Sequence, residues 1–442
     1  MIRLRNLAWS LLRPSVMREF RRSATDGHGD QRSTASARDA RVRRVIAEAA
    51  QHIPFYRDFW AGQGILRAAE RGNISLSDLP CLTRRHLQDG FSSMHHPGFT
   101  GAVVERSTGG SSGQPVRFIQ SRHYLDAATG RGMRTLAWSG WQPGARTAFI
   151  WGGPTELRAA DTYRQRFKEL ITNRRLFDAF RADDARYDAW LDTLVRWRPE
   201  FIIGYASALV GLSERAAATG IALPTLRAVF STAERLLPEH RARIVGAFGA
   251  PVRDQYGSRE IQALAAECSH GTMHAYLDSA VLELGAPIGD ARPILVTQLD
   301  NPAMPLIRYE NGDLSQWTAD PPGTCPCGLI YPALDGIRGR MTDLFHFPGG
   351  RIVHGEYFTH LMYDITGVRA FQFRQDRTGG ITLYLVLAGN VDQARITSTL
   401  HQRLSGLLVE IGATAAVSIK VAEEIPPVGE GKFRFTISEY AP

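Results

Sequence analysis

A glycine-rich segment at residues 107–115 (STGGSSGQP) is the first part of the sequence whose composition suggests chemistry. Glycines let a backbone bend tightly and approach a ligand closely, and successive backbone N–H groups in such a bend bind anions, typically phosphate. The segment lies between two runs typical of strands, at 102–106 and 116–120, so we expect the loop of a hairpin. No Gly-Lys-Ser/Thr follows, which excludes a Walker A loop. A glycine- and serine-rich surface loop without a ligand is the alternative.

Cysteine and histidine residues form a second group with the composition of a metal site. The sequence CSHGTMH (268–274) supplies one cysteine and two histidines, and TCPCG (324–328) supplies a close pair of cysteines. Three thiolates and one imidazole satisfy tetrahedral zinc, and a site closed by four protein ligands is structural. We therefore predict a structural zinc held by four residues: Cys268, His274, Cys325 and Cys327. His270 is the competing nitrogen ligand, and free thiols without metal are the alternative.

The composition is that of an ordinary globular protein. The chain has 442 residues, of which 44% are hydrophobic and 22% charged, so it has ample apolar material for a core and is not predominantly disordered. No apolar run reaches the ~20 residues that a membrane-spanning helix needs. Four cysteines in this length do not make a disulfide scaffold.

The net charge is positive and carried almost entirely by arginine. Only three of the 52 basic residues are lysines (Lys168, Lys420 and Lys432), so 49 are arginines, and the formal charge is +8. The arginines are scattered and no basic run is interleaved with aromatic residues, so we expect no nucleic-acid partner.

The first forty residues are polar and basic. The opening stretch (MIRLRNLAWSLLRP) is interrupted by Arg13 and Pro14 and has no small-residue cleavage site, which argues against a secretory signal. We expect a cytoplasmic protein whose N-terminus either forms an ordinary first helix or makes weak contact with a membrane surface. The patch at 23–36 (SATDGHGDQRSTAS) is rich in turn-forming residues, so we expect it to form a loop.

Strand-like and helical segments alternate after residue 100, which predicts an α/β fold. The strand-like runs are AVVER, VRFIQ, TAFIWG, FIIGY, AVFST and PILVTQL, and helical stretches include 184–197 and 238–248. Residues 41–70 also look helical. Residues 341–442 differ, because three strand-like runs flank one helical segment, VDQARITSTLHQRLSGLLVEIG, which indicates a small α+β domain. We therefore expect a basic, partly flexible segment (1–40), a large domain (41–340) and a small C-terminal domain (341–442).

Five segments, taken in order, resemble the adenylate-forming superfamily of acyl-CoA synthetases, adenylation domains and luciferases. STGGSSGQP resembles its phosphate loop, QYGSRE (255–260) its Tyr-Gly-x-x-Glu segment, and IRYENGDL (307–314) its Tyr-x-x-Gly-Asp segment. GRMTDLFHFPGGRI (339–352) resembles its hinge, and EGKFRF (430–435) its C-terminal Gly-Lys segment. The resemblance covers roughly residues 45–440. It implies that the 41–340 domain binds ATP and an acyl group, and that the C-terminal domain is a mobile lid.

Within the superfamily, the chain looks most like the phenylacetate–CoA ligase branch, especially its capsular-polysaccharide-biosynthesis-type members. The segments that carry this likeness are HIPFYRDFW (52–60), LPCLTRRHL (79–87), GYAS (204–207) and the GKFRF ending. Some members of this branch resemble the chain in carrying a structural zinc. The identity of the substrate does not follow from the branch.

The resemblance implies a set of nucleotide-binding residues in the large domain. The phosphate-loop residues would wrap the β- and γ-phosphates of ATP; these are Ser107, Thr108, Gly109, Gly110, Ser111, Ser112 and Gly113. Tyr256 would stack on adenine, with Gly257 and Ser258 beside the α-phosphate. Ala233 and Glu234 would line the adenine site. Glu260 would help to hold Mg²⁺, a hard cation that binds carboxylate and phosphate oxygens.

Three further residues have roles implied by the same resemblance. Asp313 and Arg340 would contact the ribose, although Asp313 after Asn311-Gly312 is also typical of a turn. Lys432 would bridge the reacting carboxylate and the α-phosphate as a compact point charge, which a forked guanidinium does not replace. Thr342 stands where many relatives carry a hinge acid, whereas the following Asp343 is retained. The sequence therefore does not decide whether the C-terminal domain rotates as it does in CoA ligases.

The resemblance implies an AMP-forming carboxylate ligase that works in two steps. A small-molecule carboxylic acid, with aryl acids among the candidates, would react with ATP to give an acyl-adenylate and pyrophosphate, and CoA would then displace AMP. One alternative passes the acyl group to an amine, hydroxyl or carrier protein. Another is a non-catalytic nucleotide-binding scaffold.

Overall fold

The computed structural model describes residues 7, 9–62, 64–107, 116–151, 163–179, 184–288, 291–348, 351–362, 365–425 and 434–440. The chain divides into two compact units. The N-terminal unit comprises residues 1–283, 295–311 and 317–336, and the C-terminal unit comprises 284–294, 312–316 and 337–442. The C-terminal unit thus takes in two short segments that the sequence-based division assigned to the large domain. No helix in the described ranges is long and apolar enough to cross a membrane.

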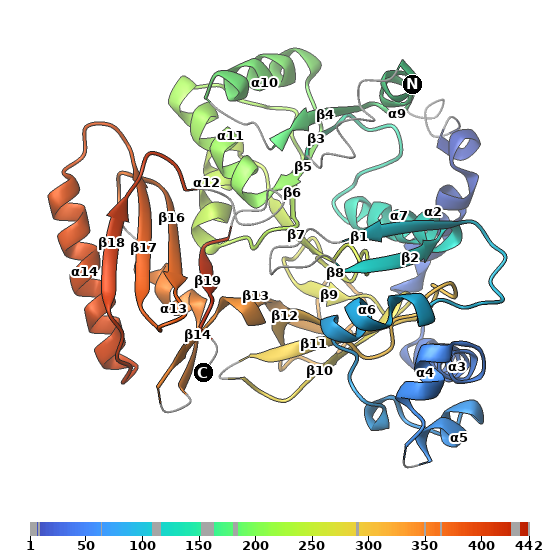
Figure 1. Ribbon diagram of the computed structural model, residues 1–442. Helices are drawn as coiled ribbons and strands as arrows, with labels where there is room; N and C mark the ends of the chain where they lie inside the picture. The colour runs from blue at the N-terminus through green and yellow to red at the C-terminus, as the bar shows by residue number, and fades with distance from the viewer. Residues whose placement is uncertain are drawn as a thin grey trace. The chain divides into compact units, whose positions relative to one another are not determined.

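A parallel sheet forms the centre of the N-terminal unit (Figure 1). Its neighbouring strands are β4 (Arg174–Asp178), β3 (Thr147–Trp151), β5 (Phe201–Tyr205), β6 (Ala228–Thr232) and β7 (Val252–Tyr256). The predicted strands TAFIWG, FIIGY and AVFST are confirmed as β3, β5 and β6. The order 7-6-5-3-4 places the carboxyl ends of all five strands at one edge of the sheet, where open α/β sheets bind their ligands.

Both faces of this parallel sheet are covered, which explains why its strands are continuously apolar. Ile202 and Val229 point into a core shared with three helices, α10 (Asp184–Trp197), α11 (Ala206–Thr219) and α12 (Pro238–Phe248). Their neighbours Phe201 and Phe230 point into a second core on the opposite face. The helices expected at 184–197 and 238–248 are confirmed. Pro238 at the first turn of α12 and Gly249 in a left-handed conformation after it define its ends.

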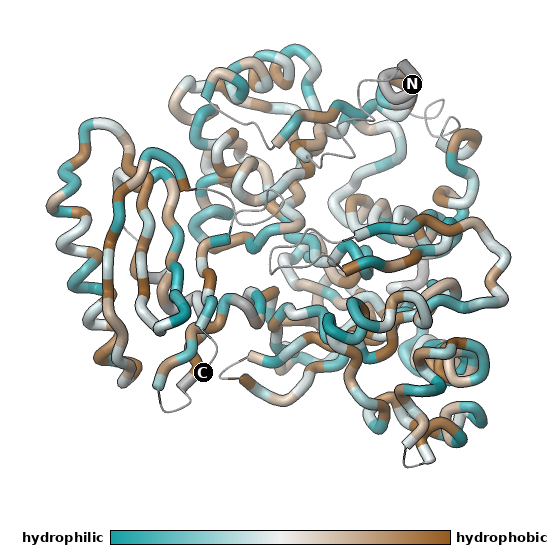
Figure 2. Tube along the Cα trace, viewed as in Figure 1, coloured by the Kyte–Doolittle hydropathy of each residue, from teal (hydrophilic) through white to brown (hydrophobic). Residues whose placement is uncertain are grey.

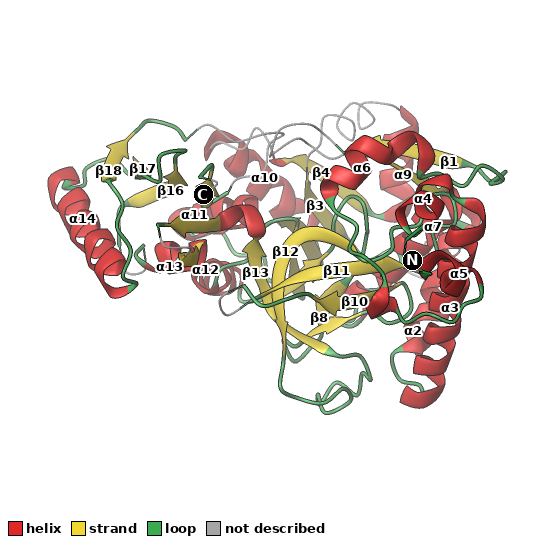
Figure 3. Ribbon diagram, turned by 60° about the horizontal axis from the view of Figure 1, so that its bottom comes forward, coloured by secondary structure: helices red, strands yellow, loops and turns green. Residues whose placement is uncertain are grey.

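The sheet continues beyond β7 in largely antiparallel strands. The full order is β10-β11-β12-β13-β9-β8-β7-β6-β5-β3-β4, and the yellow strands of Figure 3 trace part of it. The added strands are β8 (Ala265–Glu267), β9 (Met273–Ala275), β10 (Ala280–Leu284), β11 (Arg292–Gln298), β12 (Tyr309–Trp317) and β13 (Ala333–Arg340). The mixed sheet and its flanking helices confirm the α/β class expected from the sequence.

The predicted hairpin around the glycine-rich segment is present. Strand β1 (Val103–Ser107) pairs antiparallel with β2 (Arg117–Ser121), and Ser107 lies opposite Arg117. Residues 108–115 lie outside the described residues. Helix α7 (Arg122–Ala137) follows β2 directly, and the side chain of Ser121 caps it by accepting from the N–H of Tyr124 (3.1 Å).

The prediction of a loop at residues 23–36 is wrong for most of that segment. Helix α2 (Pro14–Asp26) runs through its start, and α3 (Gln31–His52) begins after four intervening residues. Asp30 caps α3 by accepting from the N–H of Ser33 (2.7 Å), so the turn-forming residues serve as a helix boundary. The helix expected over 41–70 is also interrupted, since α4 (Pro54–Phe59) and α5 (Ile65–Glu70) are separate.

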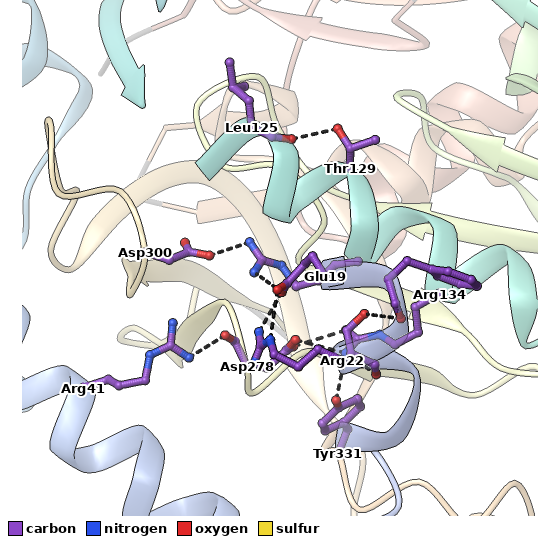
Figure 4. Close-up of polar contacts among 12 residues, drawn as sticks. Glu19, Arg22, Arg41, Leu125, Thr129, Arg134, Asp278, Asp300 and Tyr331 are labelled. Atoms are coloured by element: carbon purple, nitrogen blue, oxygen red, sulfur yellow. Dashed lines mark hydrogen bonds and ion pairs between the residues drawn. The ribbon is translucent and has the colours of Figure 1, made fainter. Parts of the chain in front are cut away.

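A buried network of charged groups fixes α2 against α7 (Figure 4). Arg131 contacts Glu19 (3.2 Å) and Asp300 (2.6 Å), while Arg134 contacts both oxygens of Asp278 (3.1 and 3.2 Å). Both arginine side chains are only 1% exposed. The opposite charges lower the pKa of Asp278 against the effect of its burial. Breaking such a pair leaves a buried charge uncompensated, so the N-terminal helices are an integral part of this unit.

The C-terminal unit has its own sheet and core. Strands β16 (Val368–Gln375), β17 (Ile381–Leu387), β18 (Val417–Val421) and β19 (Thr436–Ser438) form a sheet of order β18-β17-β16-β19. Helix α14 (Gln393–Glu410) buries Leu400 and Leu404 in that core. Figure 2 shows hydrophobic and hydrophilic residues alternating along this helix. The three strand-like runs and the helix expected in 341–442 are confirmed. A hairpin of β14 (Leu344–Phe347) and β15 (Arg351–His354) and the short helix α13 (Gly355–His360) complete the unit.

Candidate functional site

The predicted adenine-binding segment begins where β7 ends. Tyr256, the last residue of that strand, is 7% exposed, and its hydroxyl accepts from the side-chain amide of Asn311 (2.6 Å). Gly257 follows at a point of close backbone approach, because a Cβ there would lie 2.8 Å from the N atom of Ala263. Ser258 closes the turn, because its backbone N–H donates to the carbonyl of Ile261 (2.9 Å) and its hydroxyl accepts from the N–H of Ile261 (3.1 Å). Only glycine fits at the second position of this Tyr-Gly turn.

Glu260 is held at a defined place behind that turn. Its backbone carbonyl accepts from the side-chain amides of Gln120 (2.9 Å) and Gln298 (3.0 Å). Its side chain is 7% exposed and accepts a long hydrogen bond from the hydroxyl of Tyr309 (3.4 Å). A carboxylate engaged so weakly retains acceptor capacity for a hard cation, which takes one or two carboxylates plus phosphate oxygens. Glu260 therefore offers one carboxylate of the kind that Mg²⁺ binds.

The base of the glycine-rich loop lies beside the same turn. The guanidinium of Arg259 donates to the backbone carbonyl of Ser107 (3.2 Å), the residue from which the loop departs. Gln120 on β2 donates to the carbonyl of Arg259 as well (3.0 Å). Residues 107 and 259 are 152 positions apart in the sequence. The structure thus brings together the base of the loop and the QYGSRE segment, while Thr108, Gly109, Gly110, Ser111, Ser112 and Gly113 lie outside the described residues.

Ala233 and Glu234 follow β6 at the same carboxyl edge. Ala233 has a positive φ of 67°, a conformation that costs an alanine free energy and that clusters at functional sites. Glu234 accepts from the backbone N–H of Ser207 (2.8 Å) at the start of α11. An acid at this end of a helix complements the helix dipole. One carboxylate oxygen of Glu234 is therefore engaged by α11, whatever its role toward adenine.

An aromatic pair lies at this edge too. Trp151 ends β3 and Tyr205 ends β5, and their ring centroids are 5.0 Å apart. Two other aromatic side chains of this unit face its interior: Trp141 is buried in the core with α7, and Phe149 contacts Arg174. Trp151 and Tyr205 differ from Trp141 and Phe149 in their position at the carboxyl end of a strand, not in residue type. The β3–β5 pair thus marks the apolar part of the carboxyl edge.

Asp313 and Arg340 come together within the C-terminal unit. The guanidinium of Arg340 donates to the carboxylate of Asp313 (3.2 Å), which is 6% exposed. Asp313 lies inside β12, and the preceding Gly312 has a φ of +85°. The turn suggested by Asn311-Gly312 is therefore wrong, because the two residues continue a strand. The backbone N–H of Arg340 also donates to Asp343 (3.0 Å).

The four predicted zinc ligands converge in the N-terminal unit. The ligand atoms of Cys268, His274, Cys325 and Cys327 all lie within 4.8 Å of one another. The sulfur atoms of Cys268 and Cys325 are 3.8 Å apart, and Nε2 of His274 is 3.2 Å from the sulfur of Cys327. Zn–S bonds of about 2.3 Å in a tetrahedron separate two sulfur atoms by about 3.8 Å, so the spacing fits zinc.

The surroundings of this cluster suit a metal as well. Nδ1 of His274 lies 3.1 Å from the carbonyl oxygen of Tyr331, an outer contact that orients Nε2 toward a metal. Burial raises the pKa of Cys327 to about 12, and the neighbouring sulfur atoms of Cys325 and Cys268 add to that effect. Close thiolates without a cation repel one another. His270 is exposed and its ring contacts Ser269 (3.1 Å), which favours His274 over His270 as the ligand.

A pair of acids that links the Tyr256 turn to the cysteine cluster was not predicted from the sequence. Glu267 precedes Cys268, and its carboxylate receives two hydrogen bonds from Arg241 (2.6 and 3.0 Å) and one from the backbone N–H of Asp254 (2.9 Å). Burial raises the pKa of Asp254 to about 8, and the charge of Glu267 adds to the shift. Asp254 lies two residues before Tyr256. The signal that could have indicated this pair is the presence of charged residues, Asp254 and Glu267, within the strands β7 and β8.

Parts of the chain are similar to known proteins. Residues 345–439 match the model of the CapK C-terminal domain. The chain is 26% identical to protein CapK of Staphylococcus aureus over 272 residues, which span 60% of this chain and 59% of that protein. It is 23% identical to phenylacetate-coenzyme A ligase of Thermus thermophilus over 347 residues, or 70% of this chain and 71% of that protein.

The chain is a member of the adenylate-forming superfamily.

Solved structures show the same superfamily fold. 2-Hydroxyisobutyryl-CoA ligase in complex with 2-HIB-AMP matches with a TM-score of 0.71 and 21% identity, covering 94% of this chain and 91% of that one. The amide bond synthetase McbA from Marinactinospora thermotolerans matches with a TM-score of 0.51 and 16% identity, covering 74% and 66%. The predicted fold class and the predicted superfamily are both confirmed.

The C-terminal residue of greatest predicted importance is not described. Lys432 lies outside the described residues, but the segment that follows it is firmly attached to its own unit. The backbone carbonyl of Arg434 accepts from the amide of Gln372 (2.6 Å), and the ring of Phe435 lies 5.0 Å from that of Phe371. The chain is thus held two residues after Lys432, on β16 of this superfamily member's C-terminal unit.

Proposed function

We propose that the protein activates a carboxylic acid with ATP, forming an acyl-adenylate and pyrophosphate. The carboxylate oxygen attacks the α-phosphorus, and the bond from that phosphorus to the pyrophosphate oxygen breaks. One observation supports this proposal most directly: the hydrogen bond from Arg259 to the carbonyl of Ser107. It joins the base of a phosphate-binding type of loop to the Tyr-Gly turn and to Glu260, segments that are far apart in the sequence.

The reaction needs groups that bind phosphates, orient the two anions and exclude water. In this proposal the backbone of residues 107–113 holds the β- and γ-phosphates, and the ring of Tyr256 stacks on adenine. Asp313 and Arg340 bind the ribose, and Lys432 contacts the carboxylate and the α-phosphate. Mg²⁺ held by Glu260 would neutralise phosphate charge, and zinc held by the Cys268 cluster would stabilise the fold without taking part in the chemistry.

CoA is the proposed acceptor of the acyl group in a second step. Its thiolate would attack the acyl carbon and release AMP. The structural relative 2-hydroxyisobutyryl-CoA ligase has been solved with 2-HIB-AMP and CoA, which supports this choice. Transfer to an amine is the second candidate, because the fold is also that of the amide bond synthetase McbA. A hydroxyl or a carrier protein remains an acceptor of the same class.

An apolar or aryl acid is the proposed substrate class. Trp151 and Tyr205 form an aromatic pair at the carboxyl edge of the parallel strands, where ligands of open α/β sheets bind. Aromatic walls favour apolar and aryl groups through offset or edge-on ring contacts. The aliphatic 2-hydroxyisobutyryl group of the relative is the natural comparison substrate.

Exchange of labelled pyrophosphate into ATP, measured over a panel of aryl and aliphatic acids, tests the proposal. We expect exchange that depends on one class of acid and on Mg²⁺, and that appears without CoA. Thioester formation on addition of CoA supports the proposed acceptor, whereas acid-dependent exchange with no thioester favours transfer to an amine, hydroxyl or carrier. No exchange with any acid would favour a nucleotide-binding scaffold.

A further inference from the structure

Two exposed apolar segments of the N-terminal unit have no part in the proposed reaction. Among the described residues, every leucine and phenylalanine with a largely exposed side chain belongs to one of them: Leu7 (57%), Leu11 (74%), Leu12 (43%), Phe167 (61%) and Leu170 (69%). The first three lie in a helical stretch at the N-terminus, and the last two lie in α9 (Tyr163–Thr172). We call these five residues the apolar patch.

A contact between Trp9 and Arg174 ties the first segment to β4, the strand that follows α9. Trp9 is 2% exposed and lies within three residues of each exposed leucine of the first segment. The guanidinium of Arg174 lies 4.3 Å from the centre of the Trp9 ring and 4.9 Å from that of Phe149. Leu170 precedes Arg174 by four positions, so at most about 14 Å separate their Cα atoms. The two segments of the patch are therefore both attached next to the start of β4, the first through a buried tryptophan and the second through the chain itself.

The exposed side chains of α9 share one side of that helix. Phe167 and Leu170 are three residues apart, a spacing that places side chains next to each other on a helix. Both project to solvent although they are large and apolar. Clusters of this kind on a protein surface mark interaction sites rather than random exposure.

The same two segments are strongly basic. Residues 1–22 contain six arginines and one acid, Glu19, and α9 contains Arg164, Arg166 and Lys168 against one acid, Glu169. Desolvation between the two rings and the nearby charge of Arg13 lower the pKa of Arg174 to about 9. Arg174 therefore stays cationic at neutral pH.

We propose that the apolar patch docks on the surface of an anionic lipid bilayer. Leucine and phenylalanine side chains would enter the boundary between headgroups and acyl chains, while the basic composition of the two segments would add attraction to anionic headgroups. The charge argues for a lipid surface over a second copy of the chain, because a copy would bring the same excess of positive charge to the contact. The contact would hold the protein at a membrane surface during the proposed reaction.

Co-sedimentation of the full-length protein with vesicles tests this proposal. We would compare vesicles of phosphatidylcholine alone with vesicles that also contain phosphatidylglycerol, at low and high salt. We expect binding to the anionic vesicles that weakens as salt rises, because the basic residues contribute by screened attraction. Absence of binding at low salt, or equal binding to both vesicle types, would overturn the proposal.

A matched set of variants locates the contact. The double variant Leu11→Ser/Leu170→Ser should weaken binding to anionic vesicles by about tenfold or more, since two apolar side chains no longer leave water. Val409→Ser on α14 is the control, because Val409 is 80% exposed but lies on the other unit, and it should bind as the wild type does. Circular dichroism checks that each variant is folded. Equal binding by the wild type and the double variant would contradict a lipid-docking patch. So would a wild type that is dimeric in solution and a double variant that is monomeric.

Discussion

The guanidinium of Arg434 contacts the carboxylate of Asp343, and both side chains are largely buried. Asp343 also accepts from the backbone N–H of Arg340 (3.0 Å), the proposed ribose-binding residue. Arg434 comes two positions after Lys432. One carboxylate therefore connects the segment that carries the proposed catalytic lysine to the start of the C-terminal unit, and Asp343 supplies an acid one position after the hinge residue Thr342.

We predict that Arg434→Met and Asp343→Asn each lower the rate of pyrophosphate exchange by about tenfold, because Lys432 is then less well oriented and small misplacements slow a reaction strongly. The double variant should be no slower than the slower single variant, since both changes break one contact. Arg377→Met is the control, because the Arg377–Glu439 pair is exposed (3.8 Å). Additive losses in the double variant would show that the two residues act separately.

Lys432→Ala should reduce acid-dependent exchange by at least about 100-fold while the dissociation constant for ATP changes only a few-fold. The ammonium is expected to act mainly in the transition state, where charge develops between the carboxylate and the α-phosphate. Lys420→Ala is a fair control, since Lys420 is exposed on β18 and the chain has only one other lysine. Equal losses of exchange and of ATP affinity would refute the assigned role.

Glu260→Gln keeps the size and the backbone contacts of the residue but removes its charge. We expect exchange to fall by about 100-fold and the Mg²⁺ concentration needed for half-maximal rate to rise, because a neutral amide is a poorer ligand for a hard cation. Glu214→Gln changes an exposed acid paired with Arg243 and should leave both values unchanged. An unaltered Mg²⁺ dependence in Glu260→Gln would argue that another residue holds the ion.

Much of the fold was predictable because its signals are local. The strands FIIGY and AVFST are apolar on both faces, and α12 carries Pro238 at its start and Gly249 after its end. The loop expected at 23–36 failed for a local reason as well, since Asp30 caps a helix with the same residue types that form turns. Propensity does not distinguish a loop from a helix boundary.

The site was predictable only in part, because its supporting contacts join distant segments. The motifs named Tyr256, Glu260 and the zinc ligands, but nothing in the sequence indicated that Arg259 contacts Ser107 or that Asn311 contacts Tyr256. The choice of His274 over His270 likewise depends on β9, which directs His274 toward the cysteines. Such contacts follow from the order of the strands in the sheet, which differs from their order in the sequence.

The cysteine cluster should bind one equivalent of zinc per chain. Cys327→Ser should lose the metal, because three ligands remain, and should melt at a lower temperature, because structural zinc contributes to folding. Cys81→Ser is the matched control, since Cys81 is the one cysteine outside the cluster, and it should keep both metal and stability. Metal analysis after purification and after reloading with zinc provides the measurement. Less than about half an equivalent in the wild type would exclude a structural zinc.

Asp254 should make the stability of the N-terminal unit fall as pH rises. Burial and the charge of Glu267 raise its pKa from an ordinary 3.8 to about 8, so between these values the folded chain holds a proton that the unfolded chain has released. Stability from this group is therefore complete below about pH 4 and is lost up to about pH 8, by up to about 1.4 kcal/mol per pH unit. The side chain of the Asp254→Asn variant cannot ionise. The difference in free energy of unfolding, variant minus wild type, should therefore increase from pH 5 to pH 8. Urea denaturation across that range, with the exposed Asp58→Asn as control, measures the difference. Parallel pH profiles for wild type and Asp254→Asn would mean that Asp254 is ionised in the folded protein, with Arg241 and Ser231 stabilising its charge.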